Sequence, residues 1–184
     1  IPAEPLFRSM LSPLIIGETI DDIPYLWSKM WKSTFIQGRM GITVMAMSAI
    51  DIALWDCLGR TNNLPLWKLW EGQDKEFPVY GSGCYRGLGH DGMIEKAQKF
   101  VSDGFKSIKM QVAHTFSNEE DICNVRDMRQ VLGNDIGIMI DVNQGWSVEE
   151  TIKVSKQIEK YAPEWLEEPV MADDFEGYDK ICNS

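Results

Sequence analysis

The first 76 residues carry apolar side chains at the spacing of α-helices. Asp21 and Asp22 precede apolar residues three and four positions apart, which predicts a helix with an acidic N-terminal cap. Its apolar positions are Ile23, Leu26, Trp27, Met30 and Trp31. A second stripe runs from Ile42 to Leu58, where Gly59 and a polar loop at 60–63 are expected to end the helix. Pro65 then opens a short helix, and this half of the chain offers no obvious chemistry.

From about residue 77 the pattern changes to short apolar runs that alternate with amphipathic segments. Strands are predicted at 77–81, 107–112, 137–142 and 164–167, and helices at 91–103, 118–132, 148–161 and 173–181. Strand–helix repeats of this length imply right-handed crossovers and a parallel sheet. The repeat of roughly 28 residues suits a (β/α)8 barrel, of which about four units fit before Ser184. The predicted fold class is therefore α/β, either part of a TIM-type barrel or an open sheet.

Composition narrows the possible partners. The chain has 28 acidic and 18 basic residues, a net charge of −10, which argues against binding to nucleic acid or to anionic lipid. No apolar run approaches the ~20 residues of a membrane span, and the first residues lack the features of a signal peptide. The four cysteines are scattered without a CxxC pair, which is typical of reduced thiols. We therefore expect a cytoplasmic protein.

Polar side chains lie at the ends of three predicted strands, where a strand buried on both faces should not carry them. Lys109 and Gln111 end the second strand, Asp141 and Asn143 follow on the third, and Glu167 ends the fourth. Barrel enzymes place catalytic groups at these carboxyl ends. Asp141 and Glu167 supply the oxygen ligands that magnesium prefers, and Lys109 supplies a cation beside them. Each residue alone is better explained by a salt bridge or a helix cap, but three at matched positions favour a site.

Four segments resemble the mandelate racemase branch of the enolase superfamily in their order and spacing. They are AIDIALWDCLGR (49–60), GFKSIKMQV (104–112), IMIDVNQGW (138–146) and WLEEPV (165–170). The resemblance implies an α+β capping domain followed by a modified TIM barrel. Residues 1–76 would be the helical part of the capping domain without its N-terminal strands, and residues 77–184 the first half of the barrel.

The resemblance also implies roles for individual residues. Asp141 and Glu167 would be two ligands of Mg²⁺, and Asn143 would lie beside the metal or the substrate carboxylate. Lys109 would help to neutralise that carboxylate. Gln111 stands where many members have a lysine that abstracts the proton next to the carboxylate. The third metal ligand and a histidine–aspartate pair are expected beyond Ser184.

This chemistry removes the proton next to a carboxylate and stabilises the resulting enediolate with magnesium. Racemisation needs a base on each face of the carbon, and a glutamine cannot accept a proton at neutral pH. Dehydration of an acid sugar is therefore the favoured reaction, with a racemase or cycloisomerase as the alternative. Tyr85 and Arg86, in the loop after the first strand, could contact the distal end of the sugar acid. His114, beyond the second strand, could contact a hydroxyl group.

A different class of function also fits the sequence. Four strands leave two exposed edges, which favour self-association, so the chain could be a catalytically silent fragment that pairs with another copy. A homo-oligomer is expected in either case. A metal-dependent hydrolase on the same barrel is a weaker alternative because the usual histidine ligands are absent from the sequence.

Overall fold

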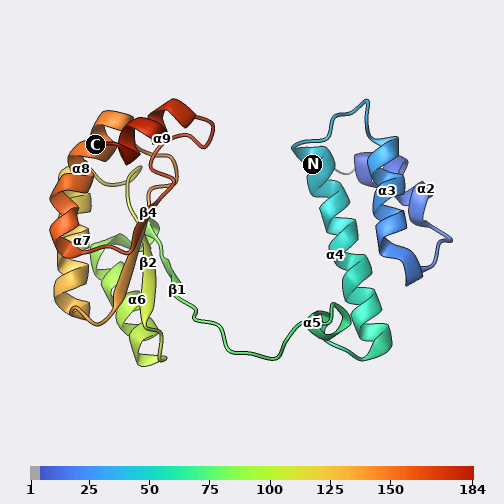
Figure 1. The fold of residues 1–184 in the computed structure, drawn as a ribbon, viewed down its shortest axis with the longest axis horizontal. Helices are drawn as coiled ribbons and strands as arrows, with labels where there is room; N and C mark the ends of the chain where they lie inside the picture. Colours follow the sequence, from blue (N-terminus) through green and yellow to red (C-terminus); the bar gives the residue numbers. More distant parts are fainter. Residues whose placement is uncertain (1–4) are drawn as a thin grey trace. The chain divides into compact units, whose positions relative to one another are not determined.

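The chain forms two compact units, one ending at Glu76 and one spanning Phe77–Ser184 (Figure 1). A computed structural model describes residues 5–184. Each unit has its own apolar core, and no residue belongs to both cores among the residues described. The two units are therefore considered separately.

The N-terminal unit is helical, as the apolar spacing predicts. Its elements are a π-helix η1 (Leu6–Leu11), α2 (Ser12–Ile15), a 3-10 turn η2 (Ile20–Asp22), α3 (Ile23–Ser33), α4 (Ile42–Asn62) and α5 (Leu66–Leu69). The predicted acidic cap of α3 is confirmed, because the Asp22 carboxylate accepts a hydrogen bond from the Tyr25 backbone N–H at 2.9 Å. Leu11, Met30, Ala46, Met47 and Ile50 form the core of this unit.

The expected end of the second helix at Gly59 is wrong. Helix α4 continues to Asn62 and ends at Asn63, whose φ of 50° is left-handed. A Cβ atom on Gly59 would lie 3.1 Å from the Leu64 carbonyl oxygen and 3.2 Å from the Leu66 side chain. Gly59 therefore allows close packing of the segment after the helix, while Asn63 makes the turn because asparagine tolerates this conformation.

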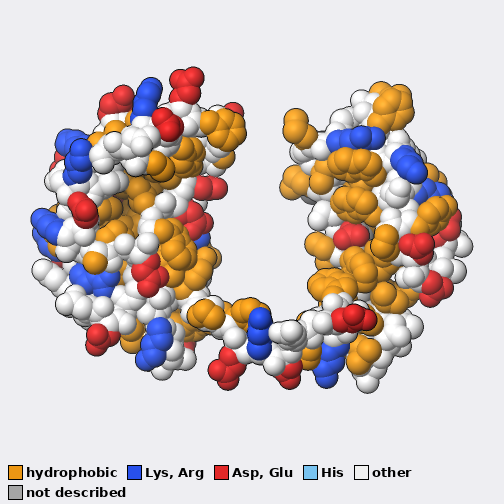
Figure 2. Space-filling model, in the orientation of Figure 1, with side chains coloured by type: hydrophobic (Ala, Val, Ile, Leu, Met, Phe, Trp, Pro, Cys, Tyr) orange, Lys and Arg blue, Asp and Glu red, His pale blue; other side chains and the backbone are white. Residues whose placement is uncertain are grey.

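Two further features of helix α4 concern its apolar residues. Part of the stripe is exposed, with Met45 at 71% and Ile52, just off the predicted positions, at 66%; apolar side chains lie along α4 in Figure 2. In addition, α4 is long and apolar enough to cross a membrane, contrary to the expectation that no segment approaches that length. Length and composition alone are weak evidence, since core helices of soluble proteins meet the same criteria.

The C-terminal unit is a parallel sheet in the order β1-β2-β3-β4, with α6, α7 and α8 covering one face (Figure 1). The strands are β1 (Gly81–Cys84), β2 (Ser107–Gln111), β3 (Gly137–Asp141) and β4 (Trp165–Glu167). The helices are α6 (Gly89–Ser102), α7 (Asn118–Leu132), α8 (Val148–Ile158) and α9 (Phe175–Cys182), with 3-10 turns η3 (Arg86–Leu88) and η4 (Glu159–Tyr161). The bounds predicted from the sequence agree closely with these, with two exceptions. The 3-10 turn η4 replaces the last turn of the helix predicted at 148–161, and the first strand lies further along the chain than predicted.

The first strand was expected at 77–81 and forms instead at Gly81–Cys84. Glycines are poor strand formers, so the apolar run before them gave the stronger signal. A Cβ atom on Gly81 would lie 2.4 Å from the ring of Phe100 on α6. The strand is therefore glycine-rich because α6 packs directly against its backbone.

Successive side chains of each strand point to opposite faces of the sheet, so the apolar core and the polar site lie on different faces. Ile108, Met110, Ile138 and Ile140 are buried and belong to the apolar core that the unit's helices help to form. Their neighbours Lys109, Gln111, Met139 and Asp141 point to the opposite face, because successive strand residues alternate. The polar residues predicted to form a site therefore share one face of the sheet.

Candidate active site

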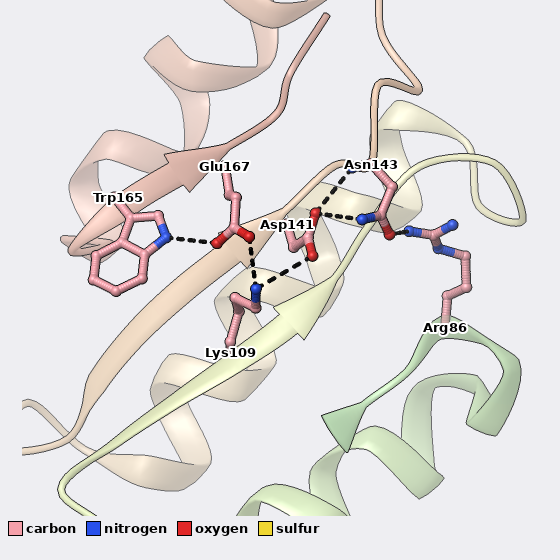
Figure 3. A network of polar contacts seen from close by, with 6 residues as sticks. All are labelled: Arg86, Lys109, Asp141, Asn143, Trp165 and Glu167. Atoms are coloured by element: carbon pink, nitrogen blue, oxygen red, sulfur yellow. Dashed lines mark hydrogen bonds and ion pairs between the residues drawn. The ribbon is translucent and has the colours of Figure 1, made fainter. Parts of the chain in front are cut away.

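The strand register brings the predicted residues together at the carboxyl ends of β2, β3 and β4. Gln111 pairs with Asp141, and Asp141 pairs with Glu167, so the three side chains form one row. Lys109 precedes Gln111 by two residues and lies on the same face, below this row (Figure 3). The site is thus a consequence of register: a shift of one residue on any strand would turn its polar group into the core.

Lys109 lies between the two carboxylates. Its Nζ donates to Glu167 Oε1 at 2.7 Å and lies 3.5 Å from Asp141 Oδ2 (Figure 3). The side chains of Lys109 and Asp141 are only 13% and 9% exposed. Burial lowers the pKa of Lys109, but the hydrogen bond to Glu167 and the charge of Asp141 outweigh it and raise that pKa overall. The same hydrogen bond lowers the pKa of Glu167. The two carboxylates therefore favour the charged form of Lys109.

The donor set fits two ligands of a divalent cation. Carboxylate oxygens of Asp141 and Glu167 both face the Lys109 ammonium, so the two side chains can share a single cation. Carboxylate oxygens are the ligands that Mg²⁺ prefers. Within residues 5–184 no group of three His, Cys, Asp or Glu side chains could hold a metal ion. Asp141 and Glu167 thus supply two carboxylate donors from neighbouring strand ends.

Asn143 holds Asp141 from the other side. Asp141 Oδ1 accepts hydrogen bonds from the Asn143 backbone N–H at 3.0 Å and from its Nδ2 at 2.6 Å. The Asn143 side-chain oxygen in turn accepts a hydrogen bond from the guanidinium of Arg86 (Figure 3). Arg86, expected to reach a sugar acid, therefore points at the residue beside a candidate metal ligand.

The other two predicted substrate contacts occupy the rim. His114 is exposed, and its Nε2 lies 2.9 Å from the backbone carbonyl oxygen of Asn143. Tyr85 is exposed and makes no hydrogen bond or ring contact with the network in the part of the chain that the structure describes. His114 is thus attached to the site through the backbone, whereas Tyr85 is not.

Trp165 joins the site although it was not among the residues predicted from the sequence. Its indole Nε1 donates to Glu167 Oε2 at 3.1 Å (Figure 3). The ring also packs edge-to-face on Tyr80, with the ring centroids 5.6 Å apart, and the centroid of the Tyr80 ring lies 5.8 Å from Lys109 Nζ. The available signal was the strand period, because residue 165 shares a face with residue 167.

The backbone after each of these strands adopts left-handed conformations at non-glycine residues. They are Ala113 and His114 after β2, Asn143 and Gln144 after β3, and Glu168 after β4. A Cβ atom on Gly145 would lie 2.7 Å from that of Ala113, so this glycine lets the loops after β2 and β3 meet. Such conformations cost energy and cluster at functional sites, where the surrounding structure maintains them.

Sequence profiles of two domain families match the chain. Residues 4–70 match the profile described as "Mandelate racemase / muconate lactonizing enzyme, N-terminal domain". Residues 92–184 match the profile described as "Enolase C-terminal domain-like", which covers half of the chain.

Individual relatives extend this similarity over nearly the whole chain. The chain is 35% identical to 3,6-anhydro-alpha-L-galactonate cycloisomerase of Streptomyces coelicolor over 91% of its own length and 46% of that protein. It is 35% identical to arabinonate dehydratase of Saccharolobus solfataricus, over 90% and 45%. A racemase structure from Streptomyces coelicolor A3(2) with bound magnesium superposes with a TM-score of 0.88 at 32% identity, covering 99% of this chain and 51% of that one. The chain thus spans about half the length of these relatives.

Proposed function

The chain belongs to the mandelate racemase and muconate lactonizing enzyme branch of the enolase superfamily, and from this we propose that the protein is a magnesium-dependent acid-sugar dehydratase. The observation that carries the proposal is the row of Gln111, Asp141 and Glu167 above the cationic Lys109. It offers two metal ligands and a carboxylate-binding cation, with no base at position 111.

Membership also confirms the predicted fold class, because the structural relatives are TIM-barrel proteins of this superfamily. The four βα units are part of such a barrel. We propose further that the helical unit is part of the capping domain, and that the protein is a cytoplasmic homo-oligomer. The cysteines support a reducing compartment, since all four are free thiols.

The residues at the strand ends have distinct proposed roles. Asp141 and Glu167 would hold magnesium, which when bound acts as a Lewis acid on developing negative charge. Lys109, protonated and largely buried, would neutralise the substrate carboxylate and favour removal of the adjacent proton. Asn143 would keep Asp141 oriented through two hydrogen bonds.

Gln111 supports dehydration over racemisation. It lies in the row of metal ligands, where a base would face the substrate, but an amide does not accept a proton at neutral pH. Racemisation by two opposed bases is therefore disfavoured. Dehydration needs one base and an acid for the leaving hydroxyl, both of which we place on the part of the relatives that this chain does not span. A cycloisomerase is the second candidate, because a relative so named is as similar as the dehydratase.

The first experiment is calorimetric titration of Mg²⁺ into the purified chain. We expect wild type to bind Mg²⁺ and Asp141→Ala to lose binding, since it removes one of two carboxylate ligands. Asp173→Ala is the matched control, because Asp173 is an exposed acid outside the site. Binding retained in Asp141→Ala, or no binding by the folded wild-type chain, would contradict the proposed metal site and favour a catalytically silent fragment.

The reaction type needs a second measurement. A protein that also contains the part of the relatives on which we place the base and the acid is incubated with Mg²⁺ in D₂O with a panel of acid sugars and followed by proton NMR. We expect loss of a hydroxyl group with formation of a 2-keto-3-deoxy acid. Ring opening or closure without loss of water would identify a cycloisomerase instead, and an epimerised substrate carrying deuterium would identify a racemase.

A further inference from the structure

Asn143, which follows β3 in a left-handed conformation, receives contacts from the loops after both other strands. Its own N–H and Nδ2 donate to Asp141 Oδ1, at the end of β3. Its backbone carbonyl oxygen lies 2.9 Å from Nε2 of His114, after β2. Its side-chain oxygen accepts a hydrogen bond from Arg86, in the 3-10 turn after β1 (Figure 3). Asn143 therefore connects a candidate metal ligand to the loops of two neighbouring strands.

The Arg86 side chain is directed toward this contact. The residue is half-buried, and its Nε is buried without a hydrogen-bond partner among the described residues. Within the described part of the chain, Asn143 is the one residue to which the guanidinium donates a hydrogen bond. Burying an N–H group without a partner is unfavourable, so an unrestrained arginine would turn this nitrogen to solvent. The guanidinium is therefore held at Asn143 rather than solvated at the surface.

The chemistry of Arg86 determines which end of the Asn143 amide faces Asp141. A guanidinium only donates hydrogen bonds, so it pairs with the amide oxygen. This orientation leaves Nδ2 to donate to the Asp141 carboxylate, which only accepts when it is ionised. A flipped amide would place its oxygen against Asp141 Oδ1 and its NH₂ group against the guanidinium, so two favourable contacts would become repulsive.

The same arrangement leaves one Asp141 oxygen for a metal. Oδ1 receives both hydrogen bonds from Asn143, whereas Oδ2 lies 3.5 Å from Lys109 Nζ. A carboxylate held at one oxygen cannot rotate freely. Oδ2 therefore stays directed at the cation that Asp141 shares with Glu167.

From these contacts we propose that Arg86 is a positioning residue, which fixes the Asn143 amide and, through it, the orientation of Asp141. This inference deepens the proposed function and rests on it for the identity of Asp141 as a metal ligand. Removing the guanidinium frees the Asn143 amide to rotate, so Asp141 loses a well-oriented donor and its Oδ2 is less well directed. Outer contacts of this kind change metal affinity by about 10- to 100-fold.

The test compares Arg86→Met with Arg86→Lys and Arg126→Met. Methionine removes every donor and lysine restores a cationic one, while Arg126 is an arginine outside the site, paired with its neighbour Asp127. We expect Arg86→Met to shift the NMR signals of the Asn143 side-chain amide, to speed their exchange with solvent and to lower Mg²⁺ affinity about tenfold. Arg86→Lys should restore part of each effect, and Arg126→Met should cause none of them.

Asn143→Gly completes the test as a double-mutant cycle. Glycine removes the amide, keeps the backbone N–H for Asp141 and adopts the left-handed conformation without strain. If Arg86 acts through Asn143, the combined variant should lose no more Mg²⁺ affinity than Asn143→Gly alone. Fully additive losses would overturn the positioning role, and so would unchanged Asn143 signals in a folded Arg86→Met protein.

Two further results separate this inference from other roles. An unchanged Mg²⁺ affinity in Arg86→Met would also overturn it and would favour a contact between Arg86 and the sugar acid, because no substrate is present in the titration. If the wild type binds no Mg²⁺, the proposed function fails. The Asn143 signals alone then decide whether Arg86 fixes the amide, since they are observed without metal.

Discussion

Asp121 lies in the first turn of α7, is 1% exposed and accepts a hydrogen bond from the Ala113 backbone N–H in the loop after β2, so its ionisation affects stability. Burial raises the pKa of this carboxyl to about 6; Glu120 also raises it, whereas the Ala113 N–H, Trp146 and Arg86 lower it. The folded pKa lies above the ordinary value of 3.8, so protonation favours the folded state. This contribution to stability is complete below about pH 4 and is lost as the pH rises through about 6.

We therefore predict that Asp121→Asn becomes more stable relative to wild type as the pH increases. Between pH 4 and pH 7 the difference in free energy of unfolding should change by about 1–3 kcal/mol, because asparagine has no charge to bury. Urea denaturation of both proteins at a series of pH values measures it. Glu119→Gln, which removes an exposed charge two residues away in the same helix turn, should show no such trend. A difference for Asp121→Asn that stays constant with pH would refute the prediction.

The residues of the site differ in how far sequence reveals them. Lys109, Asp141 and Glu167 could be selected because strand ends align in a parallel sheet, and their meeting follows from register. Asp121 could not, since an acid in the first turn of a helix is ordinary. Only the packing of α7 over the loop at Ala113 turns this residue inward.

At the scale of elements, two capping boxes fix where the helices after β2 and β3 begin. Ser117 with Glu120 caps α7, and Ser147 with Glu150 caps α8. Each serine accepts a hydrogen bond from a backbone N–H that the helix itself leaves unpaired. These caps determine where each loop of the site ends.

We predict that Ser117→Ala and Ser147→Ala each lower the free energy of unfolding by about 1 kcal/mol. Chemical denaturation measures the loss. Ser102→Ala is the matched control, because Ser102 ends α6 rather than beginning it, and its effect should stay below about 0.5 kcal/mol. Equal losses at all three serines would show that the caps contribute nothing specific.

The two wrong predictions, the end of α4 and the position of β1, have the same physical cause. Gly59 and Gly81 were interpreted through their local preferences, as a helix end and as a poor strand former. In the structure each glycine makes room for a neighbouring group, at Leu64 and Leu66 for Gly59 and at Phe100 for Gly81. Such tertiary contacts override local propensity and are not encoded in spacing.

At the scale of the whole molecule, the polypeptide between the units is accessible. Residues 71–80 are all exposed, and from Gln73 to Tyr80 they form no helix or strand. All six residues of Figure 3 come after this segment, and so does the apolar core around the sheet. The residues that build the site are therefore contained in the C-terminal unit.

We predict that limited trypsin digestion cuts after Lys75 before it cuts at lysines within helices, such as Lys99 and Lys153, because proteases need an extended and exposed segment. Mass spectrometry should detect a stable fragment that begins at Glu76. Lys75→Gln should slow its appearance without changing later cleavages. The fragment should keep the Mg²⁺ affinity of the uncut chain, because both candidate ligands and Lys109 lie within it. If affinity is lost on cleavage while the fragment stays folded, the helical unit contributes to the metal site, and a site confined to strand ends is incorrect.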